Sequence, residues 1–191
     1  TVPADEGDWR NLTNSPGVAD RQPSWSTDGR TIAWFSDEGG EYRLVVADQE
    51  GIGERRVIEL ESKTFYFTPA WSPDSRKIVF TDTHLNLWYV DVEAGRNVKV
   101  DTDNWLFPQR TIDPVWSPDS RYIAYAKRLA NKLHAVFVYS LEEGKSYQVT
   151  DGMVDALSPA WDASGKYLYF LASTDVGLNT GWLDMSSYDR P

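Results

Sequence analysis

The stretch Pro69-Ala70-Trp71-Ser72-Pro73-Asp74-Ser75-Arg76 decides the fold, because the chain repeats it. Three further copies begin at Pro23, Pro114 and Pro159, and the tryptophans of the four copies follow one another at intervals of 46, 45 and 45 residues: Trp25, Trp71, Trp116 and Trp161. A fixed period of about 40–50 residues with strand-like content is typical of a β-propeller or a similar repeat array. We therefore expect an all-β propeller of four-stranded antiparallel blades, with about four repeats, either complete or part of a larger ring.

The second copy shows the expected anatomy of one blade. Ser72-Pro73-Asp74-Ser75 suits a type I turn, and the β-branched and aromatic run 77–81 after it predicts a strand. The same order of four strands gives a single propeller segment over 1–191, with these approximate blades: 22–60, 68–102, 113–150 and 158–185. The first strands of three blades are expected to begin at Pro23, Thr68 and Ser158.

Both ends of the pattern are irregular. The last copy loses the pattern after residue 172, and residues 181–185 are expected as its third strand. Residues 9–13 resemble 147–150, the last strand of a blade, and are expected to form an outer strand. This strand either completes the last blade within the chain or belongs to a larger ring. Because the chain starts at Thr1 in mid-pattern, we expect a piece of a longer protein.

Composition excludes several classes of protein. The net charge is −10, with 29 acidic and 19 basic residues, which argues against nucleic acid as a partner because phosphate contacts need clustered Lys and Arg. There is no cysteine, so disulfides and cysteine-based metal sites are absent. No run of 18 apolar residues exists, so we expect no membrane insertion. The absence of cysteine leaves the compartment open.

The repeated residues are expected to be structural. A large aromatic side chain such as Trp71 can pack between blades, where it buries roughly 150–250 Å². The aspartates of the repeated turn can accept hydrogen bonds from backbone amides of their own turn: Asp28, Asp74 and Asp119. A calcium role would need further oxygen ligands at fixed offsets, and none is present.

Catalytic chemistry is not expected from this chain alone. His84 and His134 are the only two histidines, and neither lies in a recognisable triad or zinc motif. No glycine-rich phosphate loop exists, so no cofactor is expected. The sequence therefore predicts no catalytic residue, no metal site and no cofactor.

Function is expected where the repeat is interrupted, in residues 102–110, 127–132 and 174–191. Propellers bind partners through loops that surround the channel mouth. A peptide or a neighbouring domain is therefore expected to contact the aromatic and basic residues of the first two segments: Trp105, Phe107, Arg110, Arg128 and Lys132. The alternative is a hydrophobic plug beneath a loop and a solvated basic turn.

The phrase Pro-x-Trp-Ser-Pro-Asp-(Gly/Ser)-Arg, followed by an apolar strand, resembles the TolB-type propeller repeat. Residues 170–175, 181–187 and 189–191 are similar to the propeller region of bacterial tricorn-like proteases. The departures are Thr27 in place of proline and Asp162-Ala163-Ser164 in place of Ser-Pro-Asp.

This resemblance implies a non-catalytic propeller domain of a large serine peptidase, which guides peptide substrates or docks neighbouring domains. No position of the chain matches the catalytic residues of that family. Two alternatives stay open: a TolB-like adaptor that binds proteins at the cell envelope, and a carbohydrate-binding or sugar-cleaving propeller.

Overall fold

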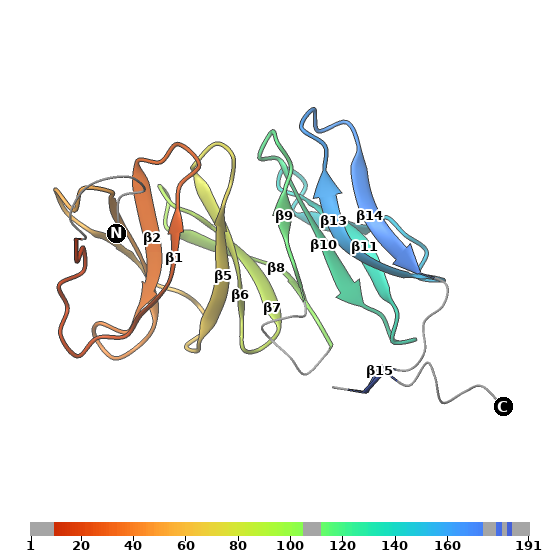
Figure 1. The fold of residues 1–191 in the computed structure, drawn as a ribbon, viewed down its shortest axis with the longest axis horizontal. Helices are drawn as coiled ribbons and strands as arrows, with labels where there is room; N and C mark the ends of the chain where they lie inside the picture. Colours follow the sequence, from red (N-terminus) through yellow and green to blue (C-terminus); the bar gives the residue numbers. More distant parts are fainter. Residues whose placement is uncertain (1–9, 105–111, 174–178, 181–182, 185–191) are drawn as a thin grey trace. The chain divides into compact units, whose positions relative to one another are not determined.

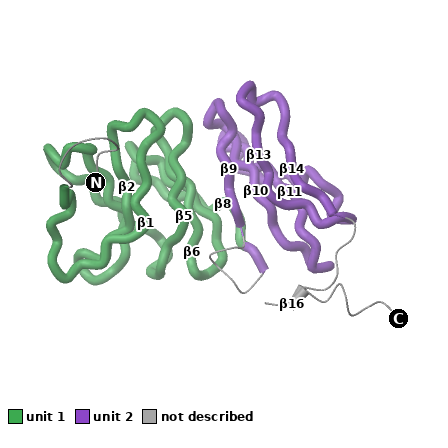
Figure 2. The backbone as a smooth tube through the Cα atoms, in the orientation of Figure 1, with its two compact units in different colours: residues 1–102 green, residues 103–191 purple. Residues whose placement is uncertain are grey.

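The computed structural model describes residues 10–104, 112–173, 179–180 and 183–184. All regular structure in these residues is β-strand (Figure 1). The described residues contain no helix that is long and apolar enough to cross a membrane. The chain divides into two compact units, residues 1–102 and residues 103–191 (Figure 2).

Within residues 10–102, unit 1 has two four-stranded antiparallel sheets whose strands follow one another in sequence order. The first sheet comprises β1 (Asp20–Trp25), β2 (Thr31–Ser36), β3 (Arg43–Asp48) and β4 (Arg56–Ile58). The second sheet comprises β5 (Tyr66–Trp71), β6 (Lys77–Asp82), β7 (Asn86–Asp91) and β8 (Arg96–Thr102). This up-and-down order is the one expected of a propeller blade.

The described residues of unit 2 form one four-stranded sheet and two hairpins. The third sheet comprises β9 (Val115–Trp116), β10 (Tyr122–Arg128), β11 (His134–Ser140) and β12 (Lys145–Gln148). One hairpin joins β13 (Asp155–Trp161) to β14 (Leu168–Ser173). The other joins β15 (Asn179–Thr180) to β16 (Leu183–Asp184), so the strand expected at 181–185 pairs with β15 and not with β14 in the described residues.

The repeated turn connects the first and second strands of each sheet by one hydrogen-bond pattern. In the second sheet, Ser75 N donates to Ser72 O at 2.9 Å, and Ser72 N donates to Lys77 O at 2.8 Å. Ser75 has a positive φ of 57°, as does Gly29 at the same place in the first turn, with 72°. This is a type I turn followed by a left-handed residue, a common hairpin connection.

The first strands begin earlier than the prolines suggested. β1, β5 and β13 each contain a shift of register, and the residue before the proline has a positive φ in each: Gln22, Thr68 and Ser158. A β-bulge therefore accommodates the proline within the strand. The strands continue on its N-terminal side to Asp20, Tyr66 and Asp155, where the sequence predicted them to begin at Pro23, Thr68 and Ser158.

The outer strand expected over 9–13 is not seen at residues 10–13, the part of it that the structure describes. Asn11 Oδ1 accepts a hydrogen bond from Asn14 N at 3.1 Å, which bends the chain out of an extended path. Arg55 Nη2 donates to Leu12 O at 2.7 Å, and the Leu12 side chain packs against the first sheet. The segment therefore covers a sheet face and does not extend a sheet edge.

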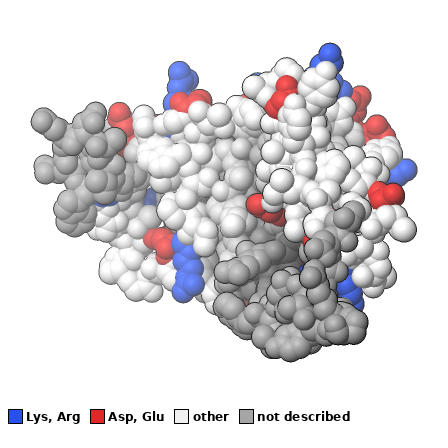
Figure 3. Space-filling view, turned by 45° about the vertical axis from the view of Figure 1, so that its right-hand side comes forward, with Lys and Arg blue, Asp and Glu red and all other residues white. Residues whose placement is uncertain are grey.

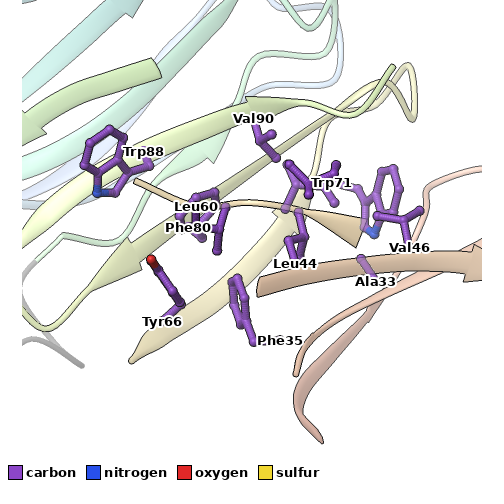
Figure 4. Packing of buried hydrophobic residues seen from close by; sticks show 12 residues of the cluster. Ala33, Phe35, Leu44, Val46, Leu60, Tyr66, Trp71, Phe80, Trp88 and Val90 are labelled. Carbon is purple, nitrogen blue, oxygen red and sulfur yellow. The ribbon is translucent and has the colours of Figure 1, made fainter. Parts of the chain in front are cut away.

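The core of unit 1 lies between its two sheets. Phe35 of β2, Tyr66 of β5 and Phe80 of β6 have ring centroids 5.1–5.6 Å apart, and all three are buried (Figure 4). Trp71 is only 8% exposed, and its Nε1 donates across the sheets to Ser24 O at 3.0 Å. Apolar packing and this hydrogen bond therefore join the two sheets.

The hydroxyl of Tyr66 provides a first test of this core. It is buried without a hydrogen-bond partner, and burial raises the pKa of Tyr66. Replacing Tyr66→Phe keeps the ring and removes an unpaired polar group, so the free energy of unfolding should stay equal or rise by up to about 1 kcal/mol. Phe80→Ala is the contrasting variant and should lose about 3–5 kcal/mol. Urea denaturation measures both, and a loss above about 1 kcal/mol for Tyr66→Phe would contradict the packing described.

Candidate functional site

The structure describes two of the five residues expected to contact a partner. Arg128 is the last residue of β10, and Lys132 lies in the connection from β10 to β11. Arg128 is half-buried and Lys132 is exposed. Trp105, Phe107 and Arg110 lie outside the described residues.

The connection 129–133 is a tightly bonded turn. Leu129 N donates to Leu133 O at 2.8 Å, and Lys132 N donates to Leu129 O at 3.0 Å. Lys132 adopts a positive φ of 72°. Asn131 Nδ2 donates to Gly152 O at 2.9 Å, which ties the turn to the segment before β13. The basic side chains are therefore presented from a fixed backbone.

Asp103 is a buried carboxylate beside this turn. It is 3% exposed, and its Oδ1 accepts hydrogen bonds from Asn104 N at 2.7 Å and Arg128 N at 3.3 Å. Its Oδ2 is buried without a hydrogen-bond partner. Burial raises the pKa of Asp103, although the two backbone hydrogen bonds act to lower it. Asp103 thus brings the start of the 102–110 segment next to Arg128.

His134 and Asp155 form a second connection at this end of unit 2. His134 Nδ1 lies 2.7 Å from Asp155 Oδ1, and the same oxygen accepts a hydrogen bond from His134 N at 2.6 Å. Both side chains are 16% exposed. The pair joins the first residue of β11 to the first residue of β13 and so holds the hairpin against the third sheet.

The pairing of His134 and Asp155 has the form of the base and its orienting carboxylate in a catalytic triad. In a triad the other ring nitrogen faces a nucleophilic hydroxyl, whereas His134 Nε2 faces Arg128 Nε at 3.5 Å. No group of three His, Asp or Glu side chains in the described part of the chain converges to hold a metal ion. The observed contacts of His134 are therefore those of a structural link.

Asp103 and Asp155 are the residues of this site that the sequence did not single out. Each gains its contacts from segments more than twenty residues away, which no local pattern reveals. The sequence pointed to these two aspartates only indirectly. Asp103 lies within the 102–110 segment, and His134, the partner of Asp155, is the first residue of a strand.

The repeated aspartates bond within their own turns. Asp119 Oδ1, for example, accepts from Ser117 Oγ at 2.6 Å and from Arg121 N at 3.1 Å, and Asp28 and Asp74 have the same partners in their turns. The hydrogen bond from Ser117 lowers the pKa of Asp119. The repeated tryptophans differ more: Trp71 is buried, Trp116 and Trp161 are half-buried, and Trp25 is 46% exposed.

Charge does not mark a binding face on the side that Figure 3 shows. Lys and Arg side chains are dispersed there among Asp and Glu side chains, and much of the surface is uncharged.

The raised pKa of Asp103 predicts an unusual dependence of stability on pH. Folding favours the protonated form, so the contribution of Asp103 to stability is present below its ordinary pKa of 3.8 and is lost as the pH rises through the raised folded value. Relative to Asp103→Asn, the wild-type chain should lose stability as the pH rises from 4 towards neutrality. Urea denaturation across this range measures the difference.

Asp119→Asn is the matched control for that measurement. The pKa of Asp119 is lowered, so its contribution to stability changes only as the pH falls below 3.8, and Asp119→Asn should show no slope between pH 4 and neutrality. The same slope for both variants would refute the assignment of Asp103 as a desolvated carboxylate.

Gly152 tests the anchoring of the turn. It has a φ of +78°, and a Cβ atom there would lie 2.3 Å from Leu129 Cδ1. Gly152→Ala should displace Leu129 and lose about 1 kcal/mol more stability than Gly144→Ala, which has a φ of +62° but meets only Tyr139 Oη at 3.7 Å. Thermal unfolding compares the two, and equal losses would show that Leu129 does not rest on Gly152.

Comparison with known proteins supplies the context for these contacts. Residues 1–176 match the family model of the tricorn protease second beta propeller domain. The chain is 30% identical over 153 residues to the uncharacterized peptidase YuxL of Bacillus subtilis, covering 79% of this chain and 21% of that protein. It is 32% identical over 93 residues to the Tol-Pal system protein TolB of Nitrosomonas europaea, covering 48% of this chain and 19% of that protein.

Among solved structures, the crystal structure of the tricorn protease aligns with a TM-score of 0.69 at 21% identity, over 80% of this chain and 15% of that one. The chain thus spans 14–21% of the length of the curated relatives it matches. The all-β propeller class and the resemblance to tricorn and TolB propellers are confirmed. The chain belongs to the family of the tricorn protease second beta propeller domain.

Proposed function

We propose that this chain is a non-catalytic propeller domain of a tricorn-like serine peptidase, and that the turn after β10 contacts peptide substrates or a neighbouring domain. The observation that carries the proposal is the family match over residues 1–176, combined with a basic turn whose backbone is fixed. The match supplies the peptidase context, and the turn supplies a surface outside the repeated contacts.

Fixed geometry favours the turn as a contact surface. Leu129, Asn131 and Lys132 are held by hydrogen bonds and by packing on Gly152, so presenting the basic side chains loses little further backbone entropy on binding. Asp103 and Asp155 stabilise the two ends of the connection by bonding Arg128 N and His134 N.

Charge favours an acidic or carboxylate-bearing partner for this turn. The segment 127–132 contains three basic residues, Lys127, Arg128 and Lys132. Its positive charge contrasts with the net charge of −10 of the whole chain. Local potential of this kind steers oppositely charged groups to a surface.

A TolB-like role in protein binding is the second candidate. The similarity to a Tol-Pal system protein favours it, because the same fixed turn could contact a folded protein partner in place of a peptide. The two roles differ in whether the domain works beside a peptidase core.

The test is a double charge reversal in the peptidase that contains this chain. Arg128→Glu with Lys132→Glu should raise the KM for acidic peptides about threefold to tenfold and leave kcat nearly unchanged, since two ionic contacts at the surface each contribute roughly 0.2–1 kcal/mol. Steady-state kinetics with matched acidic and neutral peptides measure the effect.

The control is Arg96→Glu with Lys145→Glu, which makes the same change of charge at two exposed positions on β8 and β12. An equal KM effect from the control would show a general effect of charge. An unchanged KM in the turn variant would refute the peptide-contact proposal, and loss of a protein partner without a kinetic effect would favour the adaptor role.

A further inference from the structure

The contact between His134 and Asp155 fixes which nitrogen of the imidazole carries a proton. Asp155 Oδ1 lies 2.7 Å from His134 Nδ1 and also accepts a hydrogen bond from His134 N at 2.6 Å. Because an ionised carboxylate only accepts hydrogen bonds, Nδ1 is the donor in this contact. The neutral ring therefore carries its proton on Nδ1 and a lone pair on Nε2.

Arg128 contacts the other nitrogen of the ring. Arg128 and His134 face each other as a residue pair of β10 and β11, and Arg128 Nε lies 3.5 Å from His134 Nε2. A guanidinium keeps its protons in proteins, so Arg128 Nε is always a donor. Nε2 of a neutral imidazole can accept this hydrogen bond, whereas Nε2 of a charged imidazole carries a proton and cannot. The contact is therefore compatible with only one of the two charge states of His134.

The charged groups around His134 come from three parts of unit 2. β13 supplies Asp155, and β10 supplies Arg128 and Lys127. The segment after β8 supplies Asp103, whose carboxylate interacts with the charges of both His134 and Lys127. Two carboxylates and two cations thus lie around the ring, and Asp155 and Arg128 are the ones in contact with its nitrogens.

Burial strengthens the effect of a charge change at this ring. The side chains of His134 and Asp155 are each 16% exposed, and electrostatic interactions are less screened where little water is present. Histidine is the side chain whose charge ordinarily changes between pH 5 and 8. When His134 gains a proton, its bond to Asp155 becomes a charge-assisted one, but Nε2 then directs a proton and a positive charge at the guanidinium of Arg128.

We propose that protonation of His134 releases the side chain of Arg128 and thereby strengthens the binding of carboxylate groups by the basic turn. This regulation rests on the proposed function of the turn. In the neutral state Arg128 donates its Nε proton to His134, and in the charged state that donor turns to a carboxylate of the partner. Asp155 holds the charged ring in place, so the change moves one side chain and leaves the backbone of residues 129–133 fixed.

This arrangement belongs to the third sheet. The residue pairs at the same end of the first two sheets are Ser36 with Arg43 and Thr81 with Leu87. Neither pair contains an imidazole, so neither connection changes its charge between pH 5 and 8 through such a pair.

Nitrogen-15 NMR of the 191-residue chain between pH 5 and 8 tests the coupling without any substitution. At pH 8 the protonated ring nitrogen of His134 should be Nδ1. As the pH falls, the Arg128 Nε–H resonance should shift with the midpoint of His134 and not with that of His84, the exposed second imidazole of the chain. A proton on Nε2 at pH 8, or an Arg128 resonance that does not follow His134, would overturn the proposal.

Binding of an acidic peptide and a matched neutral peptide, measured by isothermal titration calorimetry, tests the functional consequence. From pH 8 to pH 5 the affinity of the wild-type chain for the acidic peptide should rise about twofold to fivefold, the size of one ionic contact at a surface. The affinity for the neutral peptide should stay constant. His134→Gln removes the titrating ring and should abolish the rise, whereas the matched control His84→Gln should keep it.

Asp103→Asn separates the other titrating group of this cluster from His134. The asparagine keeps an oxygen that can accept from Arg128 N, so the rise in affinity should persist in this variant. A rise that is lost in Asp103→Asn and kept in His134→Gln would assign the effect to Asp103 and overturn the proposal. Coupled titration of Arg128 and His134 without peptide binding at any pH would confirm the coupling and refute the proposed function of the turn.

Discussion

The contact between successive sheets is the interaction on which the rest of unit 1 depends. A four-stranded sheet with apolar residues on both faces is not stable alone in water, because it must bury those faces. Trp71 meets this need in two ways: its ring is removed from water, which contributes about 5 kcal/mol at ~25 cal/mol per Å², and its Nε1 bonds Ser24 O. The hydrogen bond fixes where along the neighbouring strand the packing occurs.

The hairpin turns could be predicted from the sequence because their hydrogen bonds are local. The first residues of the strands before these turns could not be predicted, because they depend on contacts with another strand. The turn that begins at Ser72 depends on residues within one phrase, so its pattern was readable. The bulges at Thr68 and Ser158 form through pairing with the next strand, and each bulge allows a proline to lie inside a strand. Sequence rules take such a proline as the end of the strand. The strand predicted over 9–13 does not form at residues 10–13, because the Asn11 side chain bonds the backbone and bends the chain.

The sequence predicted a connection between two strands at 127–132, but it did not predict the contacts that fix this connection. Arg128 and Lys132 were visible as a basic segment between strands. Asp103 and Asp155, which fix that segment, approach it from distant parts of the sequence, and a single sequence carries no signal for such pairs. The repeated residues stabilise the sheets and their turns. Residues outside the repeat stabilise the connection between β10 and β11.

Trp71 stabilises the chain through a neighbouring sheet, whereas Trp25 has no such hydrogen-bond partner among the residues that the structure describes. The most direct measurement is the free energy of unfolding of Trp71→Phe and Trp25→Phe in the 191-residue chain, from urea denaturation. The expected loss is about 1–3 kcal/mol for Trp71→Phe and less than about 0.5 kcal/mol for Trp25→Phe. Equal losses at the two positions would contradict it.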